Sequence, residues 1–193
     1  MIEAHETSEL IENHGSDKSK NRAALTISFL AMILAIASLG GSNAMKEATH
    51  ENILAANAYA FFQAKSIRQT AFKIAVTDLE LQLVRDQAMP ASTQEIFQKK
   101  IDDYKKTIDR YESEPDTREG KKELLNRAKE HEKTRDHAMR QDPWFDYAEG
   151  MLQIAIVLLS VSILGSIPSL FIVGSILGLL GLLSTLNGFL LLI

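Results

Sequence analysis

The densest group of residues that could do chemistry lies between residues 131 and 137. It consists of His131, Glu132, Asp136 and His137. Imidazole and carboxylate groups are common ligands of zinc. The two histidines are six positions apart, however, so on a helix they point about 120° away from each other. The spacing therefore argues against a shared metal, and we predict no metal site and no cofactor.

Residue patterns of familiar catalytic sites do not occur in this sequence. It contains no Gly-rich phosphate loop, no His-Glu-x-x-His motif and no nucleophile elbow. The chain has no cysteine, which excludes disulfides, iron–sulfur clusters and thiol catalysis. We therefore predict no catalytic residues and no enzymatic activity.

Charge is distributed very unevenly along the chain. Residues 150–193 contain no Lys, Arg, Asp, Glu or His, whereas residues 44–149 are rich in both signs of charge. The whole chain has 21 basic and 25 acidic residues, so its net charge is only −4. Nucleic acids bind basic surfaces, and we predict no nucleic-acid partner. The balanced charge of residues 44–149 fits solvated helices with ion pairs. Together with the charge-free residues 150–193, it predicts an all-α integral membrane protein.

About three apolar segments are long enough to cross a membrane. The first is residues 22–44, after a polar tail at residues 1–21 that lacks the basic start of a signal peptide. The apolar run that ends the chain is too long for one crossing. A turn at Ser166-Ile167-Pro168-Ser169 divides it into spans at residues 143–167 and 168–193. The alternative is one bent helix followed by a segment in the membrane plane.

The start of the second span carries two further signals. Asp142-Pro143 predicts a helix N-cap followed by proline at the first helical position. Trp144, Phe145 and Tyr147 predict an aromatic belt at the membrane interface. The second transmembrane helix is therefore expected to begin at residue 143.

The orientation in the membrane follows from basic residues that flank the first span. Lys18, Lys20 and Arg22 precede it, which favours a cytoplasmic N-terminus and places the charged middle of the chain on the other side. Lys46 and Arg140 lie near the other ends of the spans and oppose this orientation. Long loops follow the positive-inside rule poorly.

Residues 45–142 are expected to form a charged helical hairpin with a kink near residue 115. Its first helix, over residues 45–89, contains no proline or glycine. Apolar residues recur there at every seventh position and predict a coiled-coil-like stripe, with Phe62, Val76 and Leu83 on the same side. The stripe consists of Ile53, Ala60, Ile67, Ile74 and Leu81.

The chain then returns in two helical pieces. Ser92 and Glu95 predict a capping box at the start of the second helix. The break at Ser113-Glu114-Pro115-Asp116 separates it from a third helix over about residues 117–141. The apolar positions of the second helix are Phe97, Ile101, Tyr104, Ile108 and Tyr111. Those of the third are Leu124, Leu125, Ala128, Ala138 and Met139.

The lengths of these helices predict an antiparallel stalk rather than three alternating traverses, although a compact three-helix bundle is the alternative. The outgoing and returning legs are of similar length, so Lys65 and Arg68 should face residues 112–119. The acidic residues there (Glu112, Glu114, Asp116 and Glu119) would be their counter-charges. Two helices bury little core, and apolar residues on both sides favour packing against other copies of the chain.

The third span carries a row of small residues with helical spacing. The row consists of Gly174, Gly178, Gly181, Thr185 and Gly188. In lipid, helices associate through close backbone approach at such residues. The seam is expected to pack against the second span of the same chain, against another subunit, or both. Nearby Asn187 is expected to bind lipid headgroups, with pore lining and helix bridging as alternatives.

The segment Asn57-Ala-Tyr-Ala-Phe-Phe-Gln-Ala-Lys-Ser-Ile-Arg-Gln-Thr70, together with Gly-Gly-Ser-Asn at residues 40–43, resembles a family of uncharacterised bacterial membrane proteins. This is domain-of-unknown-function family 4337. The resemblance implies a bacterial origin and a membrane location, and it implies no activity. Within the segment, a set of polar residues forms either a partner-binding surface or the contacts that fix the stalk's register. They are Asn57, Gln63, Lys65 and Arg68.

Together these features predict a multi-pass protein of the bacterial inner (cytoplasmic) membrane with a cytoplasmic N-terminus. Its expected partners are the lipid bilayer, further copies of itself and another membrane protein. We expect a self-associating scaffold or an accessory subunit of a membrane complex. The alternative is a small oligomeric channel, since charge-free helices with small residues suit a pore that is gated by dewetting.

Overall fold

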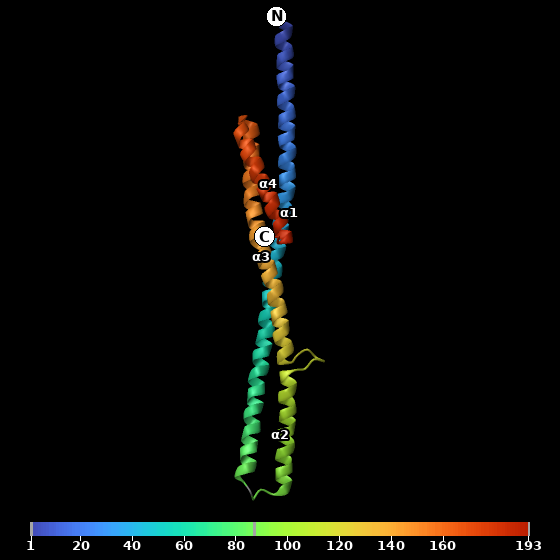
Figure 1. Ribbon diagram of the computed structural model, residues 1–193, viewed down its shortest axis with the longest axis vertical. Coiled ribbons are helices and arrows are strands. Elements are labelled where there is room, and N and C mark those ends of the chain that lie inside the picture. Colours follow the sequence, from blue (N-terminus) through green and yellow to red (C-terminus); the bar gives the residue numbers. More distant parts are fainter. Residues whose placement is uncertain (1, 87, 193) are drawn as a thin grey trace. The chain divides into compact units, whose positions relative to one another are not determined.

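The computed structural model describes residues 2–86 and 88–192, with side chains described from Asn21 onward. Within these residues the chain forms four α-helices and no strand, which confirms the all-α prediction (Figure 1). The polar tail predicted at residues 1–21 belongs to the first helix from Ile2 on, and Met1 lies outside the described residues. The helices are α1 (Ile2–Arg85), α2 (Ala91–Glu112), α3 (Lys121–Gly165) and α4 (Pro168–Leu190).

The four helices divide into two compact units. The membrane unit comprises Met1–Ala48 and Asp136–Ile193, and the hairpin unit comprises Thr49–Arg135. Three helices, α1, α3 and α4, are long and apolar enough to cross a membrane by length and composition. This agrees with the three predicted spans.

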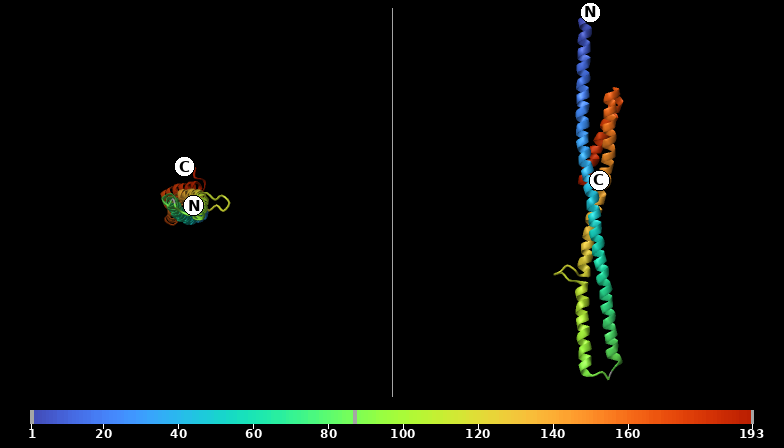
Figure 2. Two further views of the ribbon diagram at one scale, coloured as in Figure 1. Left: turned by 90° about the horizontal axis from the view of Figure 1, so that it is seen from below. Right: turned by 180° about the vertical axis from the view of Figure 1, so that it is seen from behind.

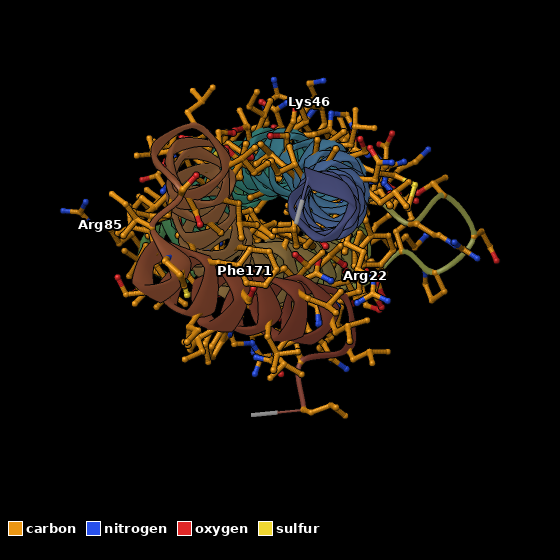
Figure 3. The ribbon with its side chains drawn as sticks, turned by 90° about the horizontal axis from the view of Figure 1, so that it is seen from above. Arg22, Lys46, Arg85 and Phe171 are labelled. Atoms are coloured by element: carbon orange, nitrogen blue, oxygen red, sulfur yellow. The ribbon has the colours of Figure 1, made fainter. Side chains whose placement is uncertain are left out.

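In the membrane unit, α1, α3 and α4 meet around a core of aliphatic side chains and alanine. Arg22 and Lys46, both labelled in Figure 3, bracket the charge-free part of α1. The buried positions of α1 and of α3 recur every three or four residues, as on one face of a helix. They are Leu30, Ile33, Ala37 and Ala44 of α1 and Phe145, Ala148, Leu152, Ala155 and Leu159 of α3.

A tight turn joins α3 to α4, as the sequence predicted. Ser166 has a positive φ of 52°, and Pro168 follows as the first residue of α4. The Ser162 hydroxyl donates a hydrogen bond to the Ile167 carbonyl at 2.9 Å, which closes the turn. The apolar end of the chain is therefore two helices with a turn, not one bent helix.

The helix start predicted at Asp142-Pro143 is wrong. α3 continues from Lys121 to Gly165, so the third helix does not end near Gln141 and Pro143 stands inside α3. Proline removes one helical hydrogen bond there. Buried side chains on both sides of the proline, including Ala138 and Phe145, hold the helix in place and outweigh this loss.

The aromatic belt predicted at the start of the second span is wrong for one of its three members. Phe145 is only 1% exposed and belongs to the core of the membrane unit. Its ring contacts Phe189 edge-on, with the centroids 4.8 Å apart. Tyr147 is exposed, and its ring lies edge-on to Trp144 with a centroid distance of 6.3 Å. For these two residues a place at the membrane interface stays a prediction.

In the hairpin unit, α1 runs antiparallel to α2 and then to the first part of α3 (Figures 1 and 2). Lys105 Nζ lies 2.8 Å from Glu80 Oε1, and Gln69 Nε2 donates to the Ile108 carbonyl at 3.0 Å. Residue numbers therefore rise along α2 as they fall along α1. All five predicted apolar positions of α2 are buried or half-buried, and Ile101 is 1% exposed.

The stripe of every seventh residue on α1 does not lie in this contact. Ile67 and Ile74 are 71% and 65% exposed. Phe62, Val76 and Leu83 follow members of the stripe by nine residues, which is two and a half helical turns, so they lie on the opposite face. The prediction that they share a side with the stripe is wrong. The row that faces α2 and α3 is Ala55, Ala58, Phe62, Lys65, Gln69, Phe72 and Val76.

The capping box predicted for α2 is also wrong. The N-cap is Pro90, with φ −58° and no side-chain cap, so Ser92 and Glu95 lie inside the helix. The fixed φ of proline starts the helix before Ser92 can cap it. Gln94 Nε2 donates to the Met89 carbonyl at 3.0 Å and ties this start to the preceding turn.

The break predicted after the second helix is confirmed. Residues 113–120 form a loop that projects from the side of the hairpin unit (Figure 1). The Glu123 carboxylate joins its two ends, because it accepts hydrogen bonds from Ser113 Oγ at 2.7 Å and from the Glu114 N–H at 3.1 Å. Gly120 packs so closely that a Cβ there would lie 2.7 Å from Ser113 Cα.

Candidate interaction surfaces

The glycine seam of α4 is buried against the other helices of the same chain. All five members, from Gly174 to Gly188, are buried. A Cβ on Gly181 would lie 2.7 Å from Leu152 Cγ on α3, and one on Gly178 would lie 2.8 Å from Leu30 Cδ1 on α1. Real Cβ atoms do not approach so closely, so a larger residue at either position would force the facing leucine to shift. The seam thus serves packing within the chain.

A notch for Phe145 lies at one end of this packing. Gly40 of α1 and Gly188 of α4 both face the Phe145 ring. A Cβ on Gly40 would lie 2.5 Å from Phe145 Cε1, and a Cβ on Gly188 would lie 2.7 Å from the same atom. Gly41 would place a Cβ 3.1 Å from Phe145 Cβ. The sequence offered a signal for this site in the adjacent Gly40-Gly41 pair, but it did not indicate which aromatic residue fills the space.

Polar side chains of α4 bind within the membrane unit. The Ser184 hydroxyl donates to the Trp144 carbonyl at 2.7 Å, and Thr185 donates to the Gly181 carbonyl at 2.8 Å. Asn187 Oδ1 accepts the Leu192 N–H at 2.9 Å, and the residue is 7% exposed. The expectation that Asn187 binds lipid headgroups is wrong, because the side chain turns inward and caps the end of its own helix.

The predicted polar surface on residues 57–68 does not form one face. Asn57, Gln63 and Arg68 are exposed, whereas Lys65 is 8% exposed. Its ammonium lies 3.6 Å from Glu114 Oε2 and 3.7 Å from Glu119 Oε2, as the hairpin register predicted. The matching prediction for Arg68 is wrong, because that residue sits at the flank of the helix.

Gln69 is a buried polar residue that the sequence analysis did not single out. Its amide Nε2 donates to Glu112 Oε2 at 3.0 Å, and its Oε1 accepts from Lys121 Nζ at 2.9 Å. Lys121 also pairs with Glu112 at 3.2 Å. Gln69 is 3% exposed, so a polar group is buried here together with its partners. Its position in the inward row, four residues after Lys65, was the available signal.

Hydrogen bonds lower the pKa of two carboxylates around this loop. The Gln69 amide, followed by the Lys121 ammonium, lowers the pKa of Glu112. The Ser113 hydroxyl, followed by the Glu114 backbone N–H, lowers the pKa of Glu123. Each donor favours the charged carboxylate. These contacts hold the ends of α2 and α3 together.

His131 and His137 have different surroundings in the structure. His131 Nδ1 lies 2.6 Å from Glu51 Oε2 of α1, and the neighbouring Glu132 accepts from the Tyr59 hydroxyl at 3.0 Å. His137 is exposed. Among the described residues, no group of three or more histidine and acidic side chains could hold a metal ion. His131 therefore contributes to the contact between α1 and α3.

The stripe on α1 is an apolar row that the other helices of the hairpin unit leave exposed. Ile53 and Leu81 are 54% and 55% exposed, and Ile67 and Ile74 between them are more so. The stripe spans four heptads, about 42 Å of helix. An apolar row of this length on an otherwise charged unit is a candidate interaction surface.

These features define an all-helical protein with three helices able to cross a membrane and a charged helical hairpin. The chain belongs to the family with a domain of unknown function, DUF4337, whose model matches residues 19–191. The resemblance noted in the sequence is thereby confirmed. Comparisons with curated proteins and with solved structures gave no match.

Proposed function

We propose that this protein is a non-enzymatic structural component of a bacterial inner membrane. It self-associates and acts as a scaffold or as an accessory subunit of a larger membrane complex. Its N-terminus lies in the cytoplasm, and its hairpin unit offers a helical surface to partners. The single observation that carries this proposal is the exposed apolar stripe on α1.

The exposed stripe lies in the hairpin unit, which is charged and compatible with water. Within a bilayer an exposed isoleucine contacts lipid and costs nothing, but the hairpin unit has charged side chains on all its helices. Burying a whole aliphatic side chain contributes about 1.5–3 kcal/mol, so each exposed member of the stripe forgoes a large part of that. Ile67 at 71% and Ile74 at 65% exposure are the largest of these losses. A partner helix recovers them.

The buried contacts of the membrane unit bear on the channel alternative. The glycine seam packs within the chain, and Ser184 and Thr185 bind backbone carbonyls. The glycines and Ser184 of α4 thus hold the three helices together, whereas Thr185 bonds within α4. They give no support to a pore built around α4, and the scaffold proposal is favoured.

The proposal is tested by the native mass of the full chain in lipid nanodiscs, measured by mass spectrometry or light scattering. We expect one oligomer of defined size that persists as the protein-to-lipid ratio is lowered. A monomer at every ratio would overturn self-association. Bilayer conductance of the same oligomer would favour the channel over the scaffold.

A further inference from the structure

We propose that the stripe on α1 binds the same stripe of a second copy of this chain, in parallel and in register. The surface consists of Ile53, Ala60, Ile67, Ile74 and Leu81. This inference rests on the proposed self-association and names the surface and geometry by which it occurs. Four features of the chain support it. α1 is apolar on two opposite sides, the stripe is rich in isoleucine, the charges beside the stripe are complementary in a parallel pair, and all copies share one membrane.

Helix α1 is apolar on two opposite sides. Phe62 faces α3, where Lys121 Nζ lies 5.6 Å from the centre of its ring. Ile67 and Ile74 point the other way and are mostly exposed. A surface helix needs only one apolar face, and a second one indicates a helix enclosed between partners. The intrachain face is already covered by α2 and α3.

The side chains of the stripe suit a contact between two parallel helices. β-branched residues are common at the first core position of parallel two-stranded coiled coils, and three of the five stripe positions are isoleucine. The row three residues further on includes Thr70 and Thr77. Their hydroxyls donate to the Ser66 and Lys73 carbonyls, both at 3.0 Å. They bring no unsatisfied donor into a contact.

The size of the contact is sufficient for a specific interface. The five stripe residues expose roughly 500 Å² in each copy, so a contact that covered them completely would bury about 1,000 Å² in the two copies before flanking residues are included. This reaches the lower range of specific protein interfaces. The row beside the stripe contains Ala64 and Ala71, which allow a close approach of the two helices.

The charged residues beside the stripe are complementary when two copies of α1 pair in parallel and in register. In a parallel, in-register pair, the residue before a stripe position faces the residue five positions later in the partner helix. Lys73 then faces Asp78 of the second copy, and Glu80 faces Arg85. Both pairs are opposite in charge. Glu80 also binds Lys105 of its own chain at 2.8 Å and would be shared between them.

Insertion into a shared membrane limits the directions in which two copies of α1 can pair. Copies that insert with the same orientation into one bilayer are related by rotation about the membrane normal. Equivalent segments of α1 therefore run in the same direction in every copy. Of the geometries open to a second copy, the parallel one is the one that the anchor and the charges both favour.

The test uses single cysteines, because the natural chain contains none. Ile53→Cys, Ile67→Cys and Leu81→Cys are each made in the full chain and oxidised in nanodiscs. Parallel helices in register bring each cysteine within disulfide distance of its own counterpart. Arg68→Cys and Gln82→Cys are matched controls, since both are exposed on the same helix beside the stripe. We expect disulfide-linked dimers at all three stripe positions and at neither control.

Other patterns overturn the proposal in distinct ways. Dimers at residue 67 alone, with mixed linkage of residues 53 and 81, would show antiparallel pairing. An oligomer in native mass without any stripe disulfide would place self-association on another surface and leave the proposed function standing. If the same variants are oxidised in the membranes of the expressing bacteria before purification, linkage of the stripe cysteines to a different protein, with no homodimer, would show that a foreign helix occupies the surface.

A charge reversal provides a second measurement. Lys73→Glu places two acids opposite each other in the parallel pair, and we expect the crosslinked fraction at residue 67 to fall roughly two- to fourfold. Adding Asp78→Lys reverses both partners and should restore it. Loss without restoration would contradict the parallel register.

Discussion

The ring of Phe145 occupies the space that a side chain at residue 40 would need. A Cβ on Gly40 would lie 2.5 Å from Phe145 Cε1, and Gly188 approaches the same ring from α4. One aromatic side chain of α3 thus joins all three helices of the membrane unit. Because lipid gives helices no hydrophobic reason to associate, close packing of this kind is their main source of stability.

Adding a methyl group to either glycine should weaken the membrane unit. We expect Gly40→Ala and Gly188→Ala each to cost about 1–3 kcal/mol, the usual cost of overpacking. Thermal unfolding in nanodiscs, followed by the fluorescence of Trp144, measures this. Gly150→Ala is the matched control, because a Cβ there meets nothing within 4 Å. Phe145→Leu should restore part of the loss in Gly40→Ala, and equal losses in all three alanine variants would argue against the notch.

The buried amide of Gln69 should matter more than the neighbouring amide that the sequence analysis selected. Gln69→Ala removes hydrogen bonds to Glu112 and Lys121, and we expect a loss of about 1–3 kcal/mol in the unfolding of the hairpin unit. Gln63→Ala, at an exposed position, should change it by less than about 0.5 kcal/mol. Urea unfolding followed by circular dichroism compares the two. Similar effects would contradict the assigned polar cluster.

How far the sequence could predict this structure is clearest at Phe62 and Ile67. Heptad spacing predicted a packed stripe on α1, but the stripe is exposed and α1 packs through the opposite row. The lengths of the helices correctly placed Lys65 opposite Glu114. The spacing could not say which of two apolar rows faces α2, because the row with isoleucine is the more hydrophobic one. The inward row contains Lys65 and Gln69, whose burial depends on partners more than 40 residues away. Such partners are set by the tertiary fold, not by local pattern.

The same limit explains the errors at the helix boundaries. Pro143 and Ser92 carry local signals for helix starts, and both lie inside helices. Local signals of this kind contribute about 1 kcal/mol. Packing outweighs this signal at Pro143, and at Ser92 the fixed φ of Pro90 starts the helix two residues earlier. The glycine seam, by contrast, was visible because five small residues at helical spacing leave one face for close approach. Only the fold could assign Leu30, Leu152 and Phe145 as the residues that fill it.

Acid should weaken the junction between α2 and α3. The folded chain lowers the pKa of Glu112 and Glu123 below the ordinary value of 4.5, so the unfolded chain binds these protons more readily. Their contribution is therefore complete above about pH 4.5 and is lost as the pH falls through the lower folded-state values. We expect the urea midpoint of the hairpin unit to fall over this window. Glu112→Gln with Glu123→Gln should flatten the dependence, and an unchanged profile would contradict the assignment. Glu95→Gln, at an exposed position, is the control.

The most direct test of the central claim is the native mass of stripe variants in nanodiscs. Ile67→Glu with Ile74→Glu places charges in the middle of the exposed stripe, where they cannot be buried against a second copy without a large desolvation cost. Ile96→Glu is the matched control, because Ile96 on α2 is 67% exposed and lies outside the stripe. We predict that the wild type and the control form the same oligomer and that the double variant is a monomer with unchanged helix content. An oligomer that survives in the double variant would contradict the assignment of the stripe as the surface of self-association.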